Sequence, residues 1–287
     1  MAPDGARAAA WPERPWLLGR RGATLISIGA AAAAAWLLLG LSLSQLAPTA
    51  GGAQLAGKFF AAALHPAISH EADFIPPGTP HFLLRVAEAL RLTIVYAAAA
   101  MSLALLIGLP LGCLASGAWW EGRGPGGAVV RWTLRGLIVA LRSVHELLWA
   151  VIFLAAFGMA PATAVLAIAL PYGGTLAKVF SEMLDEAPRR ASDALHALGA
   201  TPARRFLFGL LPAAAPDMAA YAFYRFECAV RSAAVMGFFG IPTLGYYLKL
   251  SFDNVQYREV WSYLYALIAV VLLLELWSAR LRRRVVA

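Results

Sequence analysis

Long apolar runs divide most of the chain into segments of membrane-spanning length. An α-helix needs about 20 mainly apolar residues to cross a bilayer, and six windows come close to or exceed that length: Ala23–Ala47, Val86–Gly117, Gly136–Gly158, Ala162–Met183, Pro216–Phe239 and Val260–Arg280. The chain lacks the roughly ten-residue alternating segments of a membrane β-barrel. The pattern therefore predicts an all-α membrane protein with six transmembrane helices.

The first window has an alternative interpretation as a secretory signal peptide. Its apolar core is longer than the roughly 7–15 residues of a signal-peptide core, which favours an uncleaved transmembrane helix at residues 23–47 after a basic tail at residues 1–22. Residues 48–85 then form a Gly-, Pro- and His-containing segment between the first two windows. Within it, Gln54–Leu64 spaces its apolar residues as in a helix, which indicates a short interfacial helix.

Composition and charge support the membrane assignment and add an orientation. The chain is 61% hydrophobic and 14% charged, with a formal net charge of +8, whereas soluble domains carry about 25% charged residues. Most of the basic residues fall on one side if the N-terminus is cytoplasmic, as the positive-inside rule requires. Both termini are therefore expected in the cytoplasm and residues 48–85 on the outer side of the membrane. Topology accounts for the positive charge without nucleic-acid binding.

Enzyme chemistry finds no support in the residues. No G-x-x-x-x-G-K-[ST] motif is present, so this chain should not bind ATP through a P-loop. His65, His70 and His81 lack ligand spacing, and Cys113 and Cys228 lie inside predicted spans, where packing is a simpler role than a disulfide. We expect no catalytic residues, no metal site and no cofactor bound by this chain.

One polar stretch, "DALHALGATPARRFLFGLLP" from Asp193 to Pro212, lies between the fourth and fifth windows. Ala191–Leu198 can form a short helix ended by Gly199 as a C-cap. Thr201 can cap the next helix, with Pro202 in its first turn. The pattern predicts two short helices at a fixed angle on the cytoplasmic side; the alternative is an ordinary basic loop.

The spacing of this stretch resembles the cytoplasmic "EAA" loop of bacterial ABC importer permeases, which consists of Glu-Ala-Ala, three further residues, Gly, nine further residues and then Ile-x-Leu-Pro. Asp193 stands in place of the family's Glu, Leu195 in place of its second Ala, and Gly209 in place of its Ile. The resemblance implies that residues 184–215 are a coupling loop on which a separate ATPase subunit docks. Its motif residues would be Asp193, Ala194, Gly199, Gly209, Leu211 and Pro212.

The resemblance extends over roughly Phe74–Arg284 and is most specific in "LRSVHELLWAVIFLAAFG", "KVFSEMLDEA" and "YAFYRFECAVRSAAVMGFFG", which look like phosphonate-import permeases. It implies a five-helix type I importer core at residues 86–284 preceded by one extra helix. It also implies a homodimer in the bacterial inner membrane, a cytoplasmic ATPase pair that binds ATP and Mg, and a periplasmic substrate-binding protein.

The solute implied by the resemblance is a phosphonate or a related phosphorus oxyanion. Phosphite, hypophosphite or another small, amino-acid-like solute is the alternative within the same class. A non-transporting membrane scaffold or sensor is the alternative from a different class, although a scaffold would need neither a coupling loop nor charges within the membrane.

Several charged residues fall inside the third and fifth windows, where each costs about 2.5–3.5 kcal/mol on insertion scales. Arg142–Glu146 and Glu227–Arg231 are each four residues apart, so each pair could meet along its own helix, leaving Arg225 over. One hypothesis is that these residues line the translocation pathway and favour an anion; the other is that they are buried ion pairs locking the two helices together. The pathway candidates are Arg142, His145, Glu146, Arg225, Glu227 and Arg231.

The turn after the fifth window departs from the resembled family. The family usually has Gly-Ala-Gly-Gly-Ile-Gly, whereas this chain has Gly240-Ile241-Pro242-Thr243-Leu244-Gly245. A proline fixes φ and flanking glycines free the backbone, so Gly240, Pro242 and Gly245 are candidates for a periplasmic gate. The alternative is a turn that only joins two helices. We expect Leu244–Asn254 to form a short helix at the outer surface.

Overall fold

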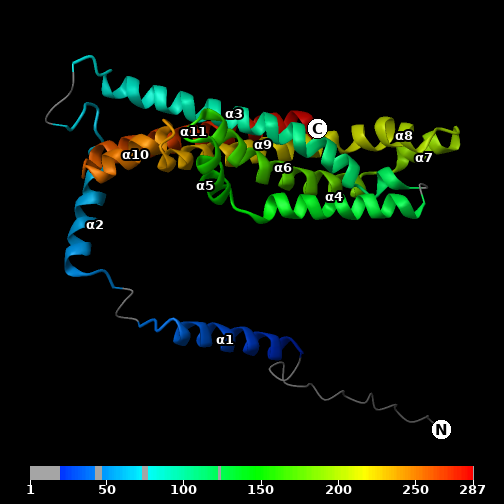
Figure 1. The fold of residues 1–287 in the computed structure, drawn as a ribbon, viewed down its shortest axis with the longest axis horizontal. Helices are drawn as coiled ribbons and strands as arrows, with labels where there is room; N and C mark the ends of the chain where they lie inside the picture. Colours follow the sequence, from blue (N-terminus) through cyan, green and yellow to red (C-terminus); the bar gives the residue numbers. More distant parts are fainter. Residues whose placement is uncertain (1–19, 43–46, 73–76, 122–123, 287) are drawn as a thin grey trace, which may run out of the picture. The chain divides into compact units, whose positions relative to one another are not determined.

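The computed structural model describes residues 20–42, 47–72, 77–121 and 124–286, and its regular structure in these ranges is helical (Figure 1). The chain divides into two units, Met1–Gly57 and Lys58–Ala287. The first contains α1 (Arg20–Leu38) and the start of α2 (Ala50–Ala63). The predicted tail at residues 1–22 lies almost entirely outside the described residues.

The second unit is built from long helices joined by short ones. Its elements are α3 (Phe82–Ala115), η3 (Ala118–Trp120), α4 (Pro125–Ser143), α5 (Glu146–Phe157), α6 (Pro161–Glu186), α7 (Arg190–Ala197), α8 (Pro202–Arg205), the π-helical turn η4 (Phe206–Leu210), α9 (Leu211–Val235), η5 (Met236–Phe239), α10 (Leu244–Asp253) and α11 (Tyr257–Val286).

Four helical stretches in the described residues are long and apolar enough to cross a membrane: Phe82–Ala115, Pro161–Glu186, Pro202–Phe239 and Tyr257–Arg280. They correspond to the second, fourth, fifth and sixth predicted windows. The first window is represented by a shorter apolar helix, Gly22–Leu38. Residues 43–46, near the end of that window, lie outside the described residues.

The third window is not the single straight helix that hydropathy predicts. Gly126–Ser143 and Glu146–Phe157 are long and apolar enough to cross a membrane only together, and they are bent by 85°. The helix is interrupted at Val144 and His145, whose backbones are extended. His145 caps the new helix, because its Nδ1 accepts a hydrogen bond of 3.3 Å from the Leu147 N–H. Glu146 follows in the first turn, where a carboxylate complements the helix dipole.

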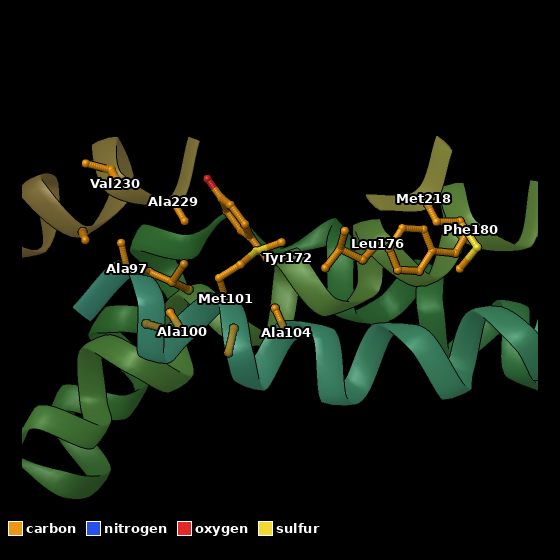
Figure 2. Packing of buried hydrophobic residues seen from close by; sticks show 14 of the residues in the cluster. Ala97, Ala100, Met101, Ala104, Tyr172, Leu176, Phe180, Met218, Ala229 and Val230 are labelled. Atoms are coloured by element: carbon orange, nitrogen blue, oxygen red, sulfur yellow. The ribbon is translucent and has the colours of Figure 1, made fainter. Parts of the chain in front are cut away.

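The centre of the second unit is a close pairing of α3 with α6, covered by α9. A Cβ added to Gly112 would lie 2.9 Å from the Phe180 Cβ and 3.0 Å from the Ala177 carbonyl oxygen. Small residues therefore let the two backbones approach where lipid supplies no hydrophobic driving force between helices. Figure 2 shows the adjoining cluster of buried side chains from the three helices: Ala97, Ala100, Met101, Ala104, Tyr172, Leu176, Phe180, Met218, Ala229 and Val230.

The segment before α3 is fastened along the start of α11. Trp261 Nε1 donates to the Phe59 carbonyl oxygen at 2.7 Å, and Tyr265 Oη donates to that of Ala63 at 2.9 Å. Further along, Arg258 Nε donates to the His65 carbonyl oxygen at 2.7 Å. The helix α2 confirms the short helix predicted near Gln54–Leu64; its position at a lipid interface stays a prediction.

Candidate functional site

The coupling loop begins with α7, whose end is closed as the sequence predicts. Leu198 is the C-cap residue, and Gly199 follows with a φ of +78°. The Gly199 N–H donates to the His196 carbonyl oxygen at 2.9 Å, and the Ala200 N–H to that of Leu195 at 3.0 Å. These two bonds form a Schellman motif, in which a left-handed glycine reverses the chain. The predicted end of the helix at Gly199 is therefore confirmed, with Gly199 one position beyond the C-cap residue.

The second half of the loop differs from the prediction of a separate helix. Thr201 occupies the N-cap position with extended backbone and Pro202 is the first helical residue, but the Thr201 side chain makes no capping hydrogen bond. α8 then continues through η4 directly into α9. Such π-helical turns insert one extra residue into a helix and often occur at functional sites.

Gly209 shows why this position departs from the isoleucine of the resembled motif. A Cβ on Gly209 would lie 2.9 Å from both the Cα and the backbone nitrogen of Ser192, so α7 and η4 touch through backbone. Asp193, Ala194 and Pro212 are exposed, whereas Gly209 is buried and Leu211 is half-buried. The motif residues thus divide into two that shape the loop, Gly199 and Gly209, and others that contribute to its surface.

A chain of polar side chains joins three helices inside the apolar core. Ser232 Oγ, on α9, donates to Glu146 Oε1, on α5, at 2.9 Å. The Tyr172 hydroxyl, on α6, lies 2.9 Å from the same Ser232 Oγ. We call Glu146, Ser232, Tyr172 and the neighbouring Arg225 the polar cluster. Tyr172 and Ser232 were missed from the sequence, because neither residue type is unusual within a membrane helix.

Arg225 lies over one aromatic ring of the cluster. Its guanidinium carbon is 4.1 Å from the centroid of the Tyr172 ring, a cation–π distance. Its Nε is buried and has no hydrogen-bond partner among the described residues. The Tyr172 ring therefore stabilises the Arg225 cation. At least one N–H donor of Arg225 makes no hydrogen bond to the described residues.

The predicted ion pair between Arg142 and Glu146 is absent from the described residues. The break at Val144 and His145 puts the two residues on different helices, and the Arg142 side chain is exposed on α4. Glu146 instead accepts from Ser232, and its Oε2 lies 3.4 Å from His145 Nε2. The assumption of one continuous helix was the error.

The predicted pair between Glu227 and Arg231 is likewise absent from the part of the chain described. Glu227 is buried at 8% exposure, and its Oε1 has no hydrogen-bond partner. Arg231 is exposed and donates from Nη2 to Cys228 Sγ at 3.3 Å. Internal ion pairing therefore does not explain the charges on α9.

The candidate gate turn is closely packed at one of its glycines. Gly240 has a φ of +88° and ends η5, and α10 confirms the short helix predicted at Leu244–Asn254. A Cβ on Gly245 would overlap the Ala234 carbonyl oxygen, to which Thr243 Oγ1 also donates at 3.2 Å. Gly245 therefore serves close packing of α10 on α9, and the role of this turn as a gate stays a prediction. Pro242 is exposed.

No group of three or more His, Cys, Asp or Glu side chains that could hold a metal occurs in the described residues. A cavity of about 570 Å³ lies between α6 and α9, beside the coupling loop. Its polar side chains are Glu186, Asp217, Tyr221 and Tyr224.

Comparison with known proteins finds a family profile that covers most of the second unit. The profile described as "Binding-protein-dependent transport system inner membrane component" matches residues 108–287. This range contains the coupling loop, the polar cluster and the turn after α9.

Three relatives illustrate the sequence similarity. The phosphite transport system permease protein PtxC of Stutzerimonas stutzeri is 38% identical over 149 residues, 52% of this chain and 54% of that protein. The putative phosphite transport system permease protein HtxE of the same organism is 34% identical over 53% of this chain and 58% of that protein. The phosphate-import permease protein PhnE of Mycolicibacterium smegmatis is 24% identical over 77% of this chain and 41% of that protein. The chain spans about half the length of these curated relatives.

Two solved structures share the fold. An amino acid ABC transporter with histidines matches with a TM-score of 0.60 at 16% identity, covering 72% of this chain and 99% of that one. The MetNI methionine ABC transporter in an inward-facing conformation matches with a TM-score of 0.61 at 22% identity, covering 71% of this chain and 96% of that one. Identities this low establish the shared fold alone.

Proposed function

Because the chain belongs to the family of binding-protein-dependent transport system inner membrane components, we propose that it is the permease subunit of an ATP-driven ABC importer for a phosphonate or a related phosphorus oxyanion. The coupling loop carries the importer assignment. It presents an exposed two-helix surface whose angle is fixed by Gly199 and Gly209. The class of solute rests on relatives named as phosphite, phosphonate and phosphate permeases.

The proposed assembly contains two copies of this chain, a cytoplasmic ATPase pair that holds ATP and Mg, and a periplasmic binding protein. Both termini and the coupling loop would lie in the cytoplasm, as the distribution of basic residues indicates. Cysteines placed at Thr79 and Thr201 test this orientation, since a membrane-impermeant maleimide should reach the first from outside and the second only from inside. Labelling of both positions from the same side would contradict the topology.

The polar cluster supplies chemistry suited to an anion in transit. The Arg225 guanidinium rests on the Tyr172 ring with a buried Nε that has no partner in the described part of this chain. A planar fork of donors matches the oxygens of a phosphorus oxyanion. One supported cation gives weak attraction rather than a tight site, which suits a pathway that must also release its solute.

The cavity beside the coupling loop favours release toward the cytoplasm. Asp217 and Glu186 contribute carboxylates to its lining, and Asp217 lies about two turns before Arg225 on α9. An anion leaving the guanidinium on this side would meet negative charge. Like charges would keep the anion from being held in this cavity, and ATP hydrolysis by the partner would supply the direction of transport.

Uptake by the reconstituted complex tests the proposal. Proteoliposomes containing the permease and its ATPase, supplied with the binding protein, should accumulate labelled phosphite or methylphosphonate when ATP is enclosed on the ATPase side. Arg225→Gln should lower uptake about tenfold or more while the complex still assembles, and Arg91→Gln is the control because that side chain is exposed and already paired with Glu88.

Each outcome of the uptake assay separates the alternatives. Competition of uptake by an amino acid, and not by phosphorus oxyanions, would favour a different solute. Absence of any ATP-dependent uptake with every solute would favour a scaffold. Normal uptake by Arg225→Gln would remove the polar cluster from the pathway, whereas loss of assembly would make Arg225 a structural residue.

A further inference from the structure

A three-residue helix between α3 and α4 touches the coupling loop at two separate points. The Trp119 ring of η3 packs edge-on against Phe206 in η4, with centroids 5.0 Å apart and planes at 86°. Glu121, which follows η3, forms an ion pair with Arg189, the N-cap residue of α7. The two contacts lie on either side of α7 in sequence, so η3 spans the base of the coupling loop.

The other side of η3 is fixed to the membrane core through one carboxylate. Asp185, near the end of α6, accepts through Oδ1 from Ser116 Oγ at 2.6 Å and from the Ala118 N–H at 3.1 Å. Its Oδ2 lies 3.3 Å from Arg135 Nη2 on α4. Arg135 Nε also donates to the carbonyl oxygen of Ala115 at 3.3 Å. The end of α3, η3, α4 and α6 are therefore joined at one point.

We propose that η3 is a clamp that holds the coupling loop to the cytoplasmic ends of α3 and α4, so that the loop and these helices move as one body. This proposal rests on the proposed function, because the ATPase partner of that function is what would move the loop. α4 runs from the clamp to the break at Val144, beyond which Glu146 joins the polar cluster. A displaced loop would thus reach the residues of the pathway through α4.

The two contacts should not contribute equally. Edge-to-face aromatic packing adds to the area that the rings bury. The Glu121–Arg189 pair is 41% and 47% exposed on its two side chains, and exposed ion pairs contribute little. Trp119 is therefore the principal positioning residue. Its neighbour Trp120 provides a matched control, because its indole donates to the Leu114 carbonyl oxygen at 2.7 Å on the α3 side.

Hydrogen exchange on the purified permease tests the clamp without any transport. Trp119→Leu should accelerate exchange of the amides in α7 and α8 by about three- to tenfold, because local opening becomes easier. Trp120→Phe should leave exchange in α7 and α8 as in the unaltered protein. Equal exchange in the unaltered and Trp119→Leu proteins would overturn the proposal, whatever the complex transports.

Cross-linking tests whether the loop and η3 move together. Cysteines at Glu121 and Arg189, in a background with Cys113→Ala and Cys228→Ala, can be joined by a short bifunctional maleimide. If η3 and the coupling loop move as one body, the cross-linked complex should retain at least half of its binding-protein-stimulated ATP hydrolysis. A loss of tenfold or more on cross-linking, reversed with a cleavable linker, would show that the two elements slide past each other and would overturn the proposal.

The coupling ratio gives the functional consequence. Trp119→Leu should lower the amount of solute imported per ATP hydrolysed at least threefold, and Trp120→Phe should not. Faster exchange in α7 with a normal coupling ratio would reject the role in transmission. Absence of stimulated ATP hydrolysis in the unaltered complex would instead refute the proposed function, and the exchange result would still decide whether the clamp exists.

Discussion

Replacing Ser232 with alanine should destabilise the second unit through the polar cluster alone. The Ser232 hydroxyl joins two other helices in the cluster: it donates to Glu146 on α5 and lies at hydrogen-bonding distance from Tyr172 on α6. Ser232 is 8% exposed, so water cannot readily replace what the substitution removes. The side chain loses a single oxygen, which leaves the packing of α9 nearly unchanged.

The loss of stability depends on the hydrogen bonds that separated helices can still form in the membrane. An unmet hydrogen bond in a soluble core costs about 1–3 kcal/mol. Helices that separate within a bilayer find other partners, and interhelical hydrogen bonds there average about 0.6 kcal/mol, with a maximum of about 1.7. Two bonds lost by Ser232→Ala therefore correspond to a free energy of unfolding lowered by about 1 kcal/mol, and by at most about 3.

Unfolding of the purified protein in mixed micelles, titrated with SDS, measures this free energy. Ser181→Ala is the matched control, because Ser181 is 4% exposed and donates only to the Lys178 carbonyl oxygen of its own helix at 2.7 Å. A double-mutant cycle with Tyr172→Phe should show coupling of about half a kcal/mol or more. The cluster would have no structural role if Ser232→Ala cost no more than Ser181→Ala and the cycle showed no coupling.

Three further predictions follow from single positions. Gly112→Ala should lower the free energy of unfolding by about 1–3 kcal/mol, because the new Cβ would press on α6. Gly136→Ala is the control, because the space around its Cβ is open. In the same SDS titration it should be neutral or stabilising by up to about 1 kcal/mol. Gly199→Val should cost about 1–2 kcal/mol at a φ of +78° and uncouple ATP hydrolysis from transport, and unchanged coupling would count against the loop geometry. A cysteine replacing exposed Pro242 should react with maleimide, whereas a cysteine replacing Thr243, which has no exposed surface, should not. If the turn is a gate in the proposed dimer, the cysteine at position 242 should also cross-link to its copy with a yield that depends on nucleotide. Reaction at position 243 and not at 242 would contradict the packing of this turn.

Hydropathy predicted most of the helices because a membrane span is a property of local sequence. Phe82–Ala115 and Pro161–Glu186 can be read from apolar length alone. The end of α7 could also be predicted, since a left-handed residue after a short helix is usually glycine and Gly199 is the available candidate. These features depend on a few consecutive residues.

Residue spacing did not reveal two features: the helix break before Glu146 and the close packing at Gly245. Spacing of four residues suggested a pair between Arg142 and Glu146, but it assumes a continuous helix, and the cap formed by His145 interrupts it. Glycines near Pro242 suggested mobility, but Gly245 is required by the Ala234 carbonyl that packs on it. A glycine that frees the backbone and one that permits close approach look identical in a single sequence.

The missing ion pairs change how the charges on α9 should be understood. A buried pair satisfies its own charges and can be purely structural. Here Glu227 retains an unpartnered oxygen and Arg225 an unpartnered nitrogen within the described part of one chain. Leaving such groups unmet in an apolar core is costly, so something outside this chain should satisfy them. In the proposed assembly a second copy or water would reach both groups, whereas a passing anion would satisfy Arg225 alone. Water or the anion would place α9 beside the route of the solute, and a second copy would place it at the dimer interface.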